Sequence, residues 1–134
     1  TVNDLDSVKR RLRVRGKTGE RVVVLSPGGA DFFAKLVDGI NDWDQPILVC
    51  EDGSPWVDHS QIKPVNKAVK AAELDPNTTL YAGRHSYITR ALSRGVPLTA
   101  IAKQCGTSTQ MIERTYANFL PEQYDDWFSF PTVA

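Results

Sequence analysis

The stretch GTSTQMIERTYANFL, residues 106–120, combines a glycine turn, a capped helix and a tyrosine near the end of that helix. Ser108 is a typical helix N-cap, because its hydroxyl can accept a hydrogen bond from an unpaired backbone N–H of the first turn. Gly106 suits the end of the preceding helix, since glycine adopts the left-handed conformation easily. Tyr116 can be a core residue, part of a DNA-reading helix, or a nucleophile, and this stretch leaves the three interpretations open.

The chain before this stretch predicts a hairpin followed by helices. RLRVRGKTGERVVVL (11–25) alternates polar and apolar residues and then becomes β-branched, which is typical of a β-hairpin with two glycines in its turn region. The spacing of the apolar residues predicts helices within 26–40 and over 58–74. From residue 80 onward every segment is helical in pattern.

The predicted fold class is α+β and mostly α. A small antiparallel sheet, made of the hairpin at about 10–25 and a short strand near 47–50, is expected to pack against a helical bundle. With 134 residues the chain is expected to form a single domain, residues 1–134. No apolar run reaches the length of a membrane span, so we expect a cytoplasmic protein without a membrane partner.

Several other kinds of site are excluded by the sequence. Two cysteines and two histidines do not have the spacing of a zinc site. The GKT at 16–18 lacks the first glycine of a phosphate-binding loop, and no GxSxG nucleophile elbow is present. The sequence therefore offers none of these three kinds of site.

The charges are arranged in blocks although the net charge is zero. Residues 1–25 carry seven Lys or Arg and three Asp or Glu, and residues 61–120 carry eight and three. Residues 26–60 and the tail are acidic. Two basic blocks that fold together would make a positive face suited to nucleic acid, whereas chance clustering on a solvated surface would not.

Two short segments carry residues that suit phosphate binding. Arg84 and His85 lie at a predicted helix start, where free N–H groups and the helix dipole favour anions. The planar fork of an arginine can hold two oxygens of one phosphate. Lys17 lies at the hairpin tip, where its ammonium can extend from the sheet toward a ligand. Taken singly, each of these is also explained as an ordinary surface residue.

A helix–turn–helix DNA-binding module without chemistry is the alternative interpretation. LTAIAKQCGTSTQMIERTYANF (98–119) contains two short helices that meet at residues 105–107, with apolar residues at the corner. In such motifs the second helix enters the major groove, so residues 107–118 would read bases. The residues expected to face the groove are Thr109, Gln110 and Glu113.

Lys17, the Arg84-His85 pair, the glycine corner and Tyr116 form an ordered set that resembles the catalytic domain of the tyrosine recombinases, also called the phage integrase family. The family pattern has a lysine on a β-hairpin, an H-x-x-R-H helix start, an L-G-[HW] corner and a tyrosine nine residues later. Here the helix start is Tyr81-Ala-Gly-Arg84-His85, the corner is Cys105-Gly106-Thr107, and Tyr116 is the ninth residue after Thr107. The resemblance is strong over 80–120 and good over 9–25.

Three positions depart from the family pattern. Tyr81 stands where the family usually has histidine, and Thr107 stands where it usually has histidine or tryptophan. The family's first arginine has no counterpart and would fall just upstream of Thr1. We therefore interpret the sequence as a fragment of a longer integrase, lacking the N-terminal part of the catalytic domain and the upstream DNA-binding domain.

The resemblance implies a role for each residue of the set. Tyr116 would attack the scissile DNA phosphate and form a 3′-phosphotyrosyl link. Arg84, with His85 nearby, would neutralise charge on the non-bridging oxygens, and Lys17 would protonate the leaving 5′-oxygen. Tyr81 and Thr107 could each donate a hydrogen bond to a phosphate oxygen.

The implied function is site-specific DNA recombination or integration, with double-stranded DNA as partner and a homo-oligomer, a tetramer, on DNA in the full-length protein. The resemblance also implies no cofactor, no metal and no small-molecule substrate. Loss of one transition-state donor typically lowers a rate by about 10²–10³-fold. Because the first arginine is missing, this fragment is expected to cleave DNA weakly or not at all by itself.

Overall fold

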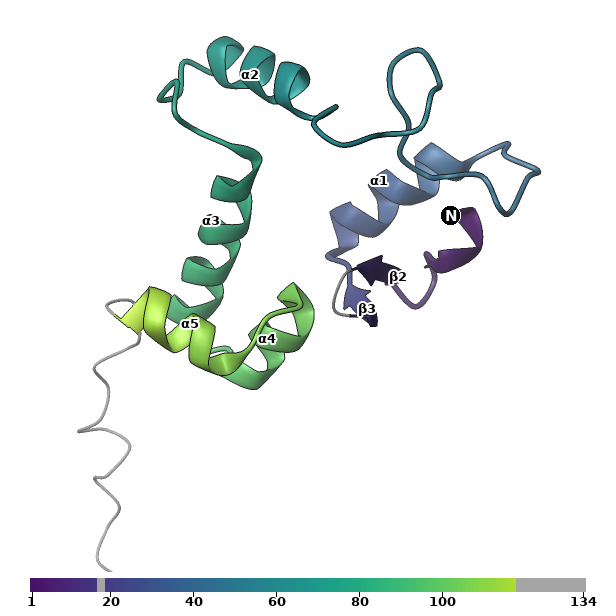
Figure 1. Cartoon of the computed structure of the whole chain (residues 1–134). Coiled ribbons are helices and arrows are strands. Elements are labelled where there is room, and N and C mark those ends of the chain that lie inside the picture. Colours follow the sequence, from purple (N-terminus) through teal and green to yellow (C-terminus); the bar gives the residue numbers. More distant parts are fainter. Residues whose placement is uncertain (17–18, 118–134) are drawn as a thin grey trace, which may run out of the picture. The chain divides into compact units, whose positions relative to one another are not determined.

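The computed structural model describes residues 1–16 and 19–117, which belong to two compact units, Thr1–Ala82 and Gly83–Ala134 (Figure 1). Each unit is described by itself. The boundary falls within the first turn of helix α3 (Leu80–Ser93), which begins in one unit and continues in the other. The expectation of a single domain stays a prediction.

The first unit contains the predicted hairpin. Strand β2 (Arg11–Gly16) pairs antiparallel with β3 (Gly19–Val24), in a register that sets Gly16 opposite Gly19. A two-residue connection therefore joins the strands, as the glycines at its ends predict. Residues 17 and 18, which include the predicted site residue Lys17, lie outside the described residues.

The third strand of the sheet differs from the prediction. The sheet order is β1-β2-β3, and β1 (Leu5–Asp6) pairs with β2 directly after a short 3-10 helix, η1 (Val2–Asp4). The segment near 47–50 instead closes on itself, with an isolated bridge between Val49 and Pro55. A tight connection costs less loop-closure entropy than a long one, which favours the neighbouring segment at the edge of β2.

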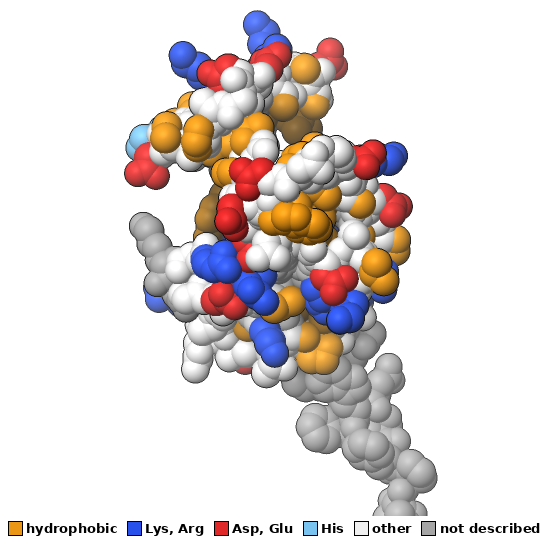
Figure 2. All heavy atoms as spheres, turned by 90° about the vertical axis from the view of Figure 1, so that its right-hand side faces the viewer, with side chains coloured by type: hydrophobic (Ala, Val, Ile, Leu, Met, Phe, Trp, Pro, Cys, Tyr) orange, Lys and Arg blue, Asp and Glu red, His pale blue; other side chains and the backbone are white. Residues whose placement is uncertain are grey.

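Helices α1 (Pro27–Val37) and α2 (Ile62–Ala71) complete the described elements of the first unit. The Ser26 hydroxyl caps α1 by accepting a hydrogen bond from the Gly29 backbone N–H at 3.1 Å. The apolar side chains of α1 are only partly buried: Ala30 is buried, whereas Phe32 remains 54% exposed. Figure 2 likewise shows apolar side chains at the surface among the charged ones.

The second unit contains the rest of α3, α4 (Leu98–Cys105) and α5 (Thr109–Tyr116). The α4–α5 corner follows the local chemistry predicted from the sequence. Gly106 has φ 64° and ψ 53°, the left-handed conformation that strains other residues. Ser108 then caps α5 by accepting a hydrogen bond from the Met111 backbone N–H at 3.1 Å.

One apolar cluster joins the three helices of this unit. Its most completely buried members are isoleucines at 1% exposure, one from each helix: Ile88, Ile101 and Ile112. The remaining buried members are Ala91, Leu92, Ala102 and Tyr116. The burial of Tyr116, with 6% of its surface exposed, places the ring of the predicted nucleophile in this core.

Candidate active site

Arg84 lies near the start of α3 and is fixed to the end of α4. Its Nη1 donates a hydrogen bond of 2.7 Å to the backbone carbonyl of Cys105, the last residue of α4. The last carbonyls of a helix lack partners within the helix and form the negative end of its dipole. The contact therefore satisfies one such carbonyl and fixes the position of the guanidinium.

Tyr116 and His85 meet although 31 residues separate them in the sequence. The Tyr116 hydroxyl oxygen lies 2.5 Å from Nδ1 of His85. The two ring centroids are 5.6 Å apart, with an angle of 46° between the ring planes. Because the tyrosine ring is buried and His85 is exposed, the contact joins the core of the unit to its surface.

The predicted residue Thr107 lies at the α4–α5 corner in the same unit. Its backbone N–H donates a 3.0 Å hydrogen bond to the carbonyl of Ala102, across the left-handed Gly106. The residue is half-buried. The corner therefore fixes the backbone of Thr107 between the two helices that carry Cys105 and Tyr116.

The other two predicted residues belong to the first unit. Tyr81 lies in the first turn of α3, three residues before Arg84, and is 60% exposed. Lys17 lies outside the described residues, and the strands on either side of it are described. Hydrogen bonds thus bring together His85 and Tyr116, and they join Arg84 to Cys105. The catalytic roles of all six predicted residues stay predictions.

The contribution of Cys105 was missed by the sequence analysis. Its carbonyl, rather than its thiol, receives the hydrogen bond from Arg84. A helix predicted to end at Gly106 must leave its last carbonyls without helical partners, and this is the signal that could have indicated an acceptor there.

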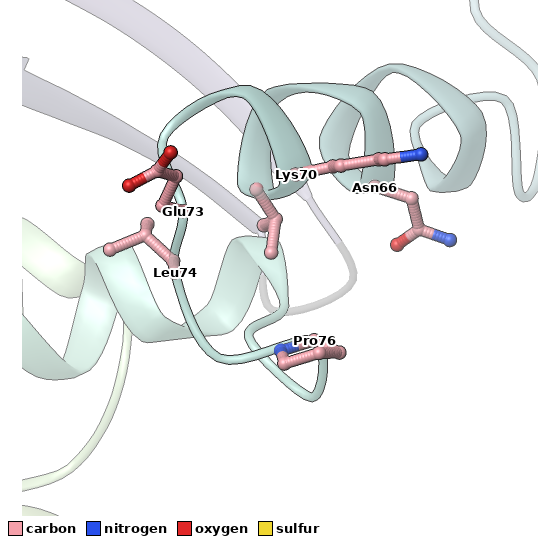
Figure 3. Close-up of a pocket in the computed structure, with 6 residues that line it drawn as sticks. Asn66, Lys70, Glu73, Leu74 and Pro76 are labelled. Carbon is pink, nitrogen blue, oxygen red and sulfur yellow. The ribbon is translucent and has the colours of Figure 1, made fainter.

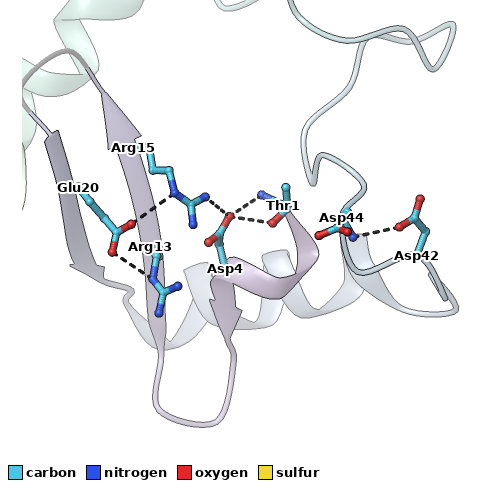
Figure 4. A network of polar contacts seen from close by, with 7 residues as sticks. All are labelled: Thr1, Asp4, Arg13, Arg15, Glu20, Asp42 and Asp44. Carbon is cyan, nitrogen blue, oxygen red and sulfur yellow. Dashed lines mark hydrogen bonds and ion pairs between the residues drawn. The ribbon is translucent and has the colours of Figure 1, made fainter.

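A polar network on the hairpin compensates part of the N-terminal basic block (Figure 4). The buried carboxylate of Asp4 accepts hydrogen bonds from the Thr1 ammonium at 2.9 Å, the Thr1 hydroxyl at 2.8 Å and Nη1 of Arg15 at 2.9 Å. These three donors hold the pKa of the Asp4 carboxyl well below its usual range. Glu20 forms ion pairs with Arg15 at 3.3 Å and with Arg13 at 3.4 Å.

The network has two consequences for the basic face predicted from the sequence. Two arginines of β2 are engaged with carboxylates of the same unit, so residues 1–25 offer less uncompensated charge than their composition indicates. The contacts also join η1, β2 and β3, the elements that support the hairpin turn.

The second unit carries cations that are not compensated in this way. Residues 83–117 contain five arginines or lysines and a single acidic residue, Glu113. Four of these cations are exposed and form no ion pair with any described residue: Arg90, Arg94, Lys103 and Arg114. The described helices around His85 and Tyr116 therefore have a net positive charge, which suits a polyanion.

The residues of the alternative helix–turn–helix interpretation are placed on α5. Gln110 and Glu113 are exposed and Thr109 is half-buried. The corner between α4 and α5 is packed by apolar residues, as that interpretation requires. Tyr116, however, directs its hydroxyl to His85 on α3.

A pocket in the first unit lies at the end of α2 (Figure 3). It is lined by Asn66, Val69, Lys70, Glu73, Leu74 and Pro76. None of these is a predicted site residue.

Among residues 1–16 and 19–117, no group of three or more His, Cys, Asp or Glu side chains is placed to hold a metal ion. No helix in these ranges has the length and apolar character needed to cross a membrane.

No protein-family model matches the chain, and no curated protein matches it. Among solved structures, the chain is similar to the crystal structure of XerA recombinase, with a TM-score of 0.73 and 18% sequence identity. The match covers 97% of this chain and 51% of that chain, so this chain spans about half the length of the recombinase chain. At this identity the similarity shows the fold, and the chain has a tyrosine-recombinase-like fold, as its motifs predict.

Proposed function

We propose that this chain is part of the catalytic domain of a site-specific recombinase that cleaves and rejoins DNA through a 3′-phosphotyrosyl intermediate. The observation that carries the proposal is the contact between the Tyr116 hydroxyl and His85, next to Arg84 at the start of α3. The recombinase-like fold supports the proposal, because Arg84, His85 and Tyr116 lie on two helices of that fold.

In the proposed reaction Tyr116 attacks the scissile phosphate, and the 5′-oxygen of the next nucleotide leaves. The covalent link conserves the phosphodiester bond energy, so strands can be rejoined without an external energy source. Arg84 donates hydrogen bonds to the non-bridging oxygens of that phosphate. Lys17 protonates the leaving oxygen, while Tyr81 and Thr107 donate hydrogen bonds to phosphate oxygens.

The proposal also covers the DNA substrate, the oligomeric state and the activity of the 134-residue chain by itself. The substrate is double-stranded DNA, and the full-length protein acts as a homo-oligomer, a tetramer, on that DNA. The family's first arginine has no counterpart among these 134 residues, so this chain alone cleaves weakly or not at all. The proposed reaction uses no metal and no cofactor.

Covalent trapping of DNA tests the proposal without knowledge of the target site. The full-length protein is incubated with a random-sequence duplex pool in which bridging 5′-oxygens are replaced by sulfur. A thiolate leaves readily without a general acid and is a poor nucleophile toward the phosphotyrosyl link, so the adduct accumulates. Nuclease digestion and mass spectrometry then locate the modified residue, which we expect to be Tyr116.

The matched variants are Tyr116→Phe and Tyr124→Phe, because both tyrosines fall in the tryptic peptide that follows Arg114. We expect the first variant to form no adduct and the second to form as much as the unmodified protein. An adduct that persists in Tyr116→Phe contradicts the proposal. Tight binding of the pool without any adduct would favour the helix–turn–helix interpretation, in which Gln110→Ala and Glu113→Ala would change sequence preference.

A further inference from the structure

We propose that His85 is the general base that accepts the phenolic proton of Tyr116 through its Nδ1 atom. This inference rests on the proposed function and deepens it, because it assigns the proton transfer that makes the tyrosine a nucleophile. The resemblance places His85 beside Arg84, which would neutralise charge on the non-bridging oxygens, and assigns it no proton transfer. The contact with Tyr116 is a feature of the folded chain.

The geometry meets the first requirement of a general base. Such a group must lie within hydrogen-bond reach, about 2.6–3.2 Å, of the atom from which it takes a proton. The Tyr116 oxygen lies 2.5 Å from Nδ1 of His85, slightly closer than this range, so the two atoms are in direct hydrogen-bond contact. A nucleophile bonded to a base of this kind is the arrangement expected in covalent catalysis.

The surroundings of the two rings determine how the pair can act. Tyr116 belongs to the buried cluster that includes Ile88 and Ile112, so burial of the ring restricts where its hydroxyl can point. His85 is exposed, so it can release the accepted proton to solvent. Free imidazole gains a proton near neutral pH, whereas a free phenol loses one only at a pH of about 10. An imidazole is therefore the appropriate acceptor for a phenolic proton at neutral pH.

The proton and bond changes balance in both directions. The Tyr116 proton moves to Nδ1 of His85, the phenolic oxygen forms a bond to phosphorus, and the bond from phosphorus to the 5′-oxygen breaks. The leaving oxygen takes a proton from Lys17. During rejoining the 5′-hydroxyl returns its proton to Lys17, and the imidazolium returns its proton to the departing Tyr116 oxygen.

The protonated state of His85 also supports charge neutralisation. Once it has accepted the proton, His85 is a cation that follows Arg84 directly in α3. The positive charge thus forms when the phosphoryl group gains negative charge. Tyr81 stands where the tyrosine recombinases usually have a histidine. His85 is therefore the histidine that remains in the H-x-x-R-H segment of this chain.

The direction of the hydrogen bond is measured by NMR on the 134-residue chain labelled with ¹⁵N-histidine. The chain has two histidines, His59 and His85, so assignment needs one variant, His59→Asn. We expect neutral His85 to carry its proton on Nε2, with an unprotonated Nδ1 whose resonance shifts in Tyr116→Phe. A neutral His85 that carries its proton on Nδ1 would overturn the inference, because it would donate to the tyrosine.

The catalytic role is measured with the full-length protein and the sulfur-substituted duplex pool. We expect His85→Ala to form the Tyr116 adduct about a hundredfold more slowly or worse, and added imidazole to restore part of the rate. The matched control His59→Asn changes the other histidine, which is exposed and has φ 70°, a conformation that asparagine tolerates. We expect this control to react at the unmodified rate.

The outcomes separate the inference from the proposed function. If the unmodified protein forms the adduct and His85→Ala forms it equally fast, the general-base assignment is wrong and the proposed function stands. If His85→Ala is slow, keeps its helical content and gains nothing from imidazole, His85 is a structural residue and the assignment is again wrong. If the unmodified protein forms no adduct, the proposed function fails and the assignment fails with it.

Discussion

Replacement of Tyr116 separates its contribution to the core from the contribution of its hydroxyl. The side chain is 6% exposed and packs with apolar residues of three helices. A buried aromatic side chain removes about 150–250 Å² from water, which at about 25 cal/mol per Å² amounts to roughly 4–6 kcal/mol as an upper value. Truncation of buried aromatic residues to alanine typically costs about 3–5 kcal/mol. We therefore expect Tyr116→Ala to lower the free energy of unfolding by about 3–5 kcal/mol.

Tyr116→Phe removes the hydroxyl and keeps the ring. The hydrogen bond to His85 is worth about 0.5–1.5 kcal/mol, and its loss leaves no buried unpaired partner, because the exposed imidazole can bond to water. We expect this variant to lose about 1 kcal/mol. It is then the appropriate variant for chemical tests, since it removes the nucleophile and leaves the core packed.

Urea unfolding followed by circular dichroism at 222 nm measures both differences. Tyr87→Ala is the matched control, because Tyr87 lies on α3 and is 43% exposed, so its loss should change the unfolding free energy by less than about 1 kcal/mol. Equal costs for Tyr116→Ala and Tyr87→Ala would refute the assignment of the Tyr116 ring to the core. Equal costs for Tyr116→Phe and Tyr116→Ala would show that the hydroxyl, not the ring, provides the stability.

Three further predictions concern the elements that support the site. Gly106→Ala places a side chain at φ 64° and should lower the free energy of unfolding by about 1–2 kcal/mol in urea titrations, with Gly106→Asn costing less. Ser108→Ala removes the α5 cap bonded to Met111 and should cost about 1 kcal/mol, whereas Ser108→Asp should retain most of the stability. Asp4 has a folded-state pKa below its unfolded value, so its contribution is present above about pH 4 and is lost as the pH falls further. The free energy of unfolding should therefore fall between pH 6 and pH 2.5, and it should fall less in Asp4→Asn. An unchanged pH dependence in Asp4→Asn would contradict a role for the contacts of Asp4 with Thr1 and Arg15.

The local elements of this protein could be predicted because their causes lie within a few residues of chain. The hairpin follows from the alternation in 11–25 and from its glycines, and the structure pairs these strands as expected. The break between α4 and α5 follows from Gly106, and the start of α5 follows from Ser108. The ordered set of motifs then predicted a recombinase-like fold, which the comparison with XerA recombinase confirms.

The contacts of the site depend on positions that are distant in the sequence. The third strand was predicted near 47–50, but Leu5–Asp6 takes that place because a short connection leads directly into β2. The acceptor for Arg84 is a backbone carbonyl 21 residues away, and a carbonyl has the same chemistry at every position of a sequence. The meeting of His85 and Tyr116 requires α3 and α5 to pack with a particular rotation around their shared isoleucine core. The sequence thus determined the helices, the hairpin and the residue types available for chemistry, whereas helix packing decided which of those residues come within hydrogen-bond distance.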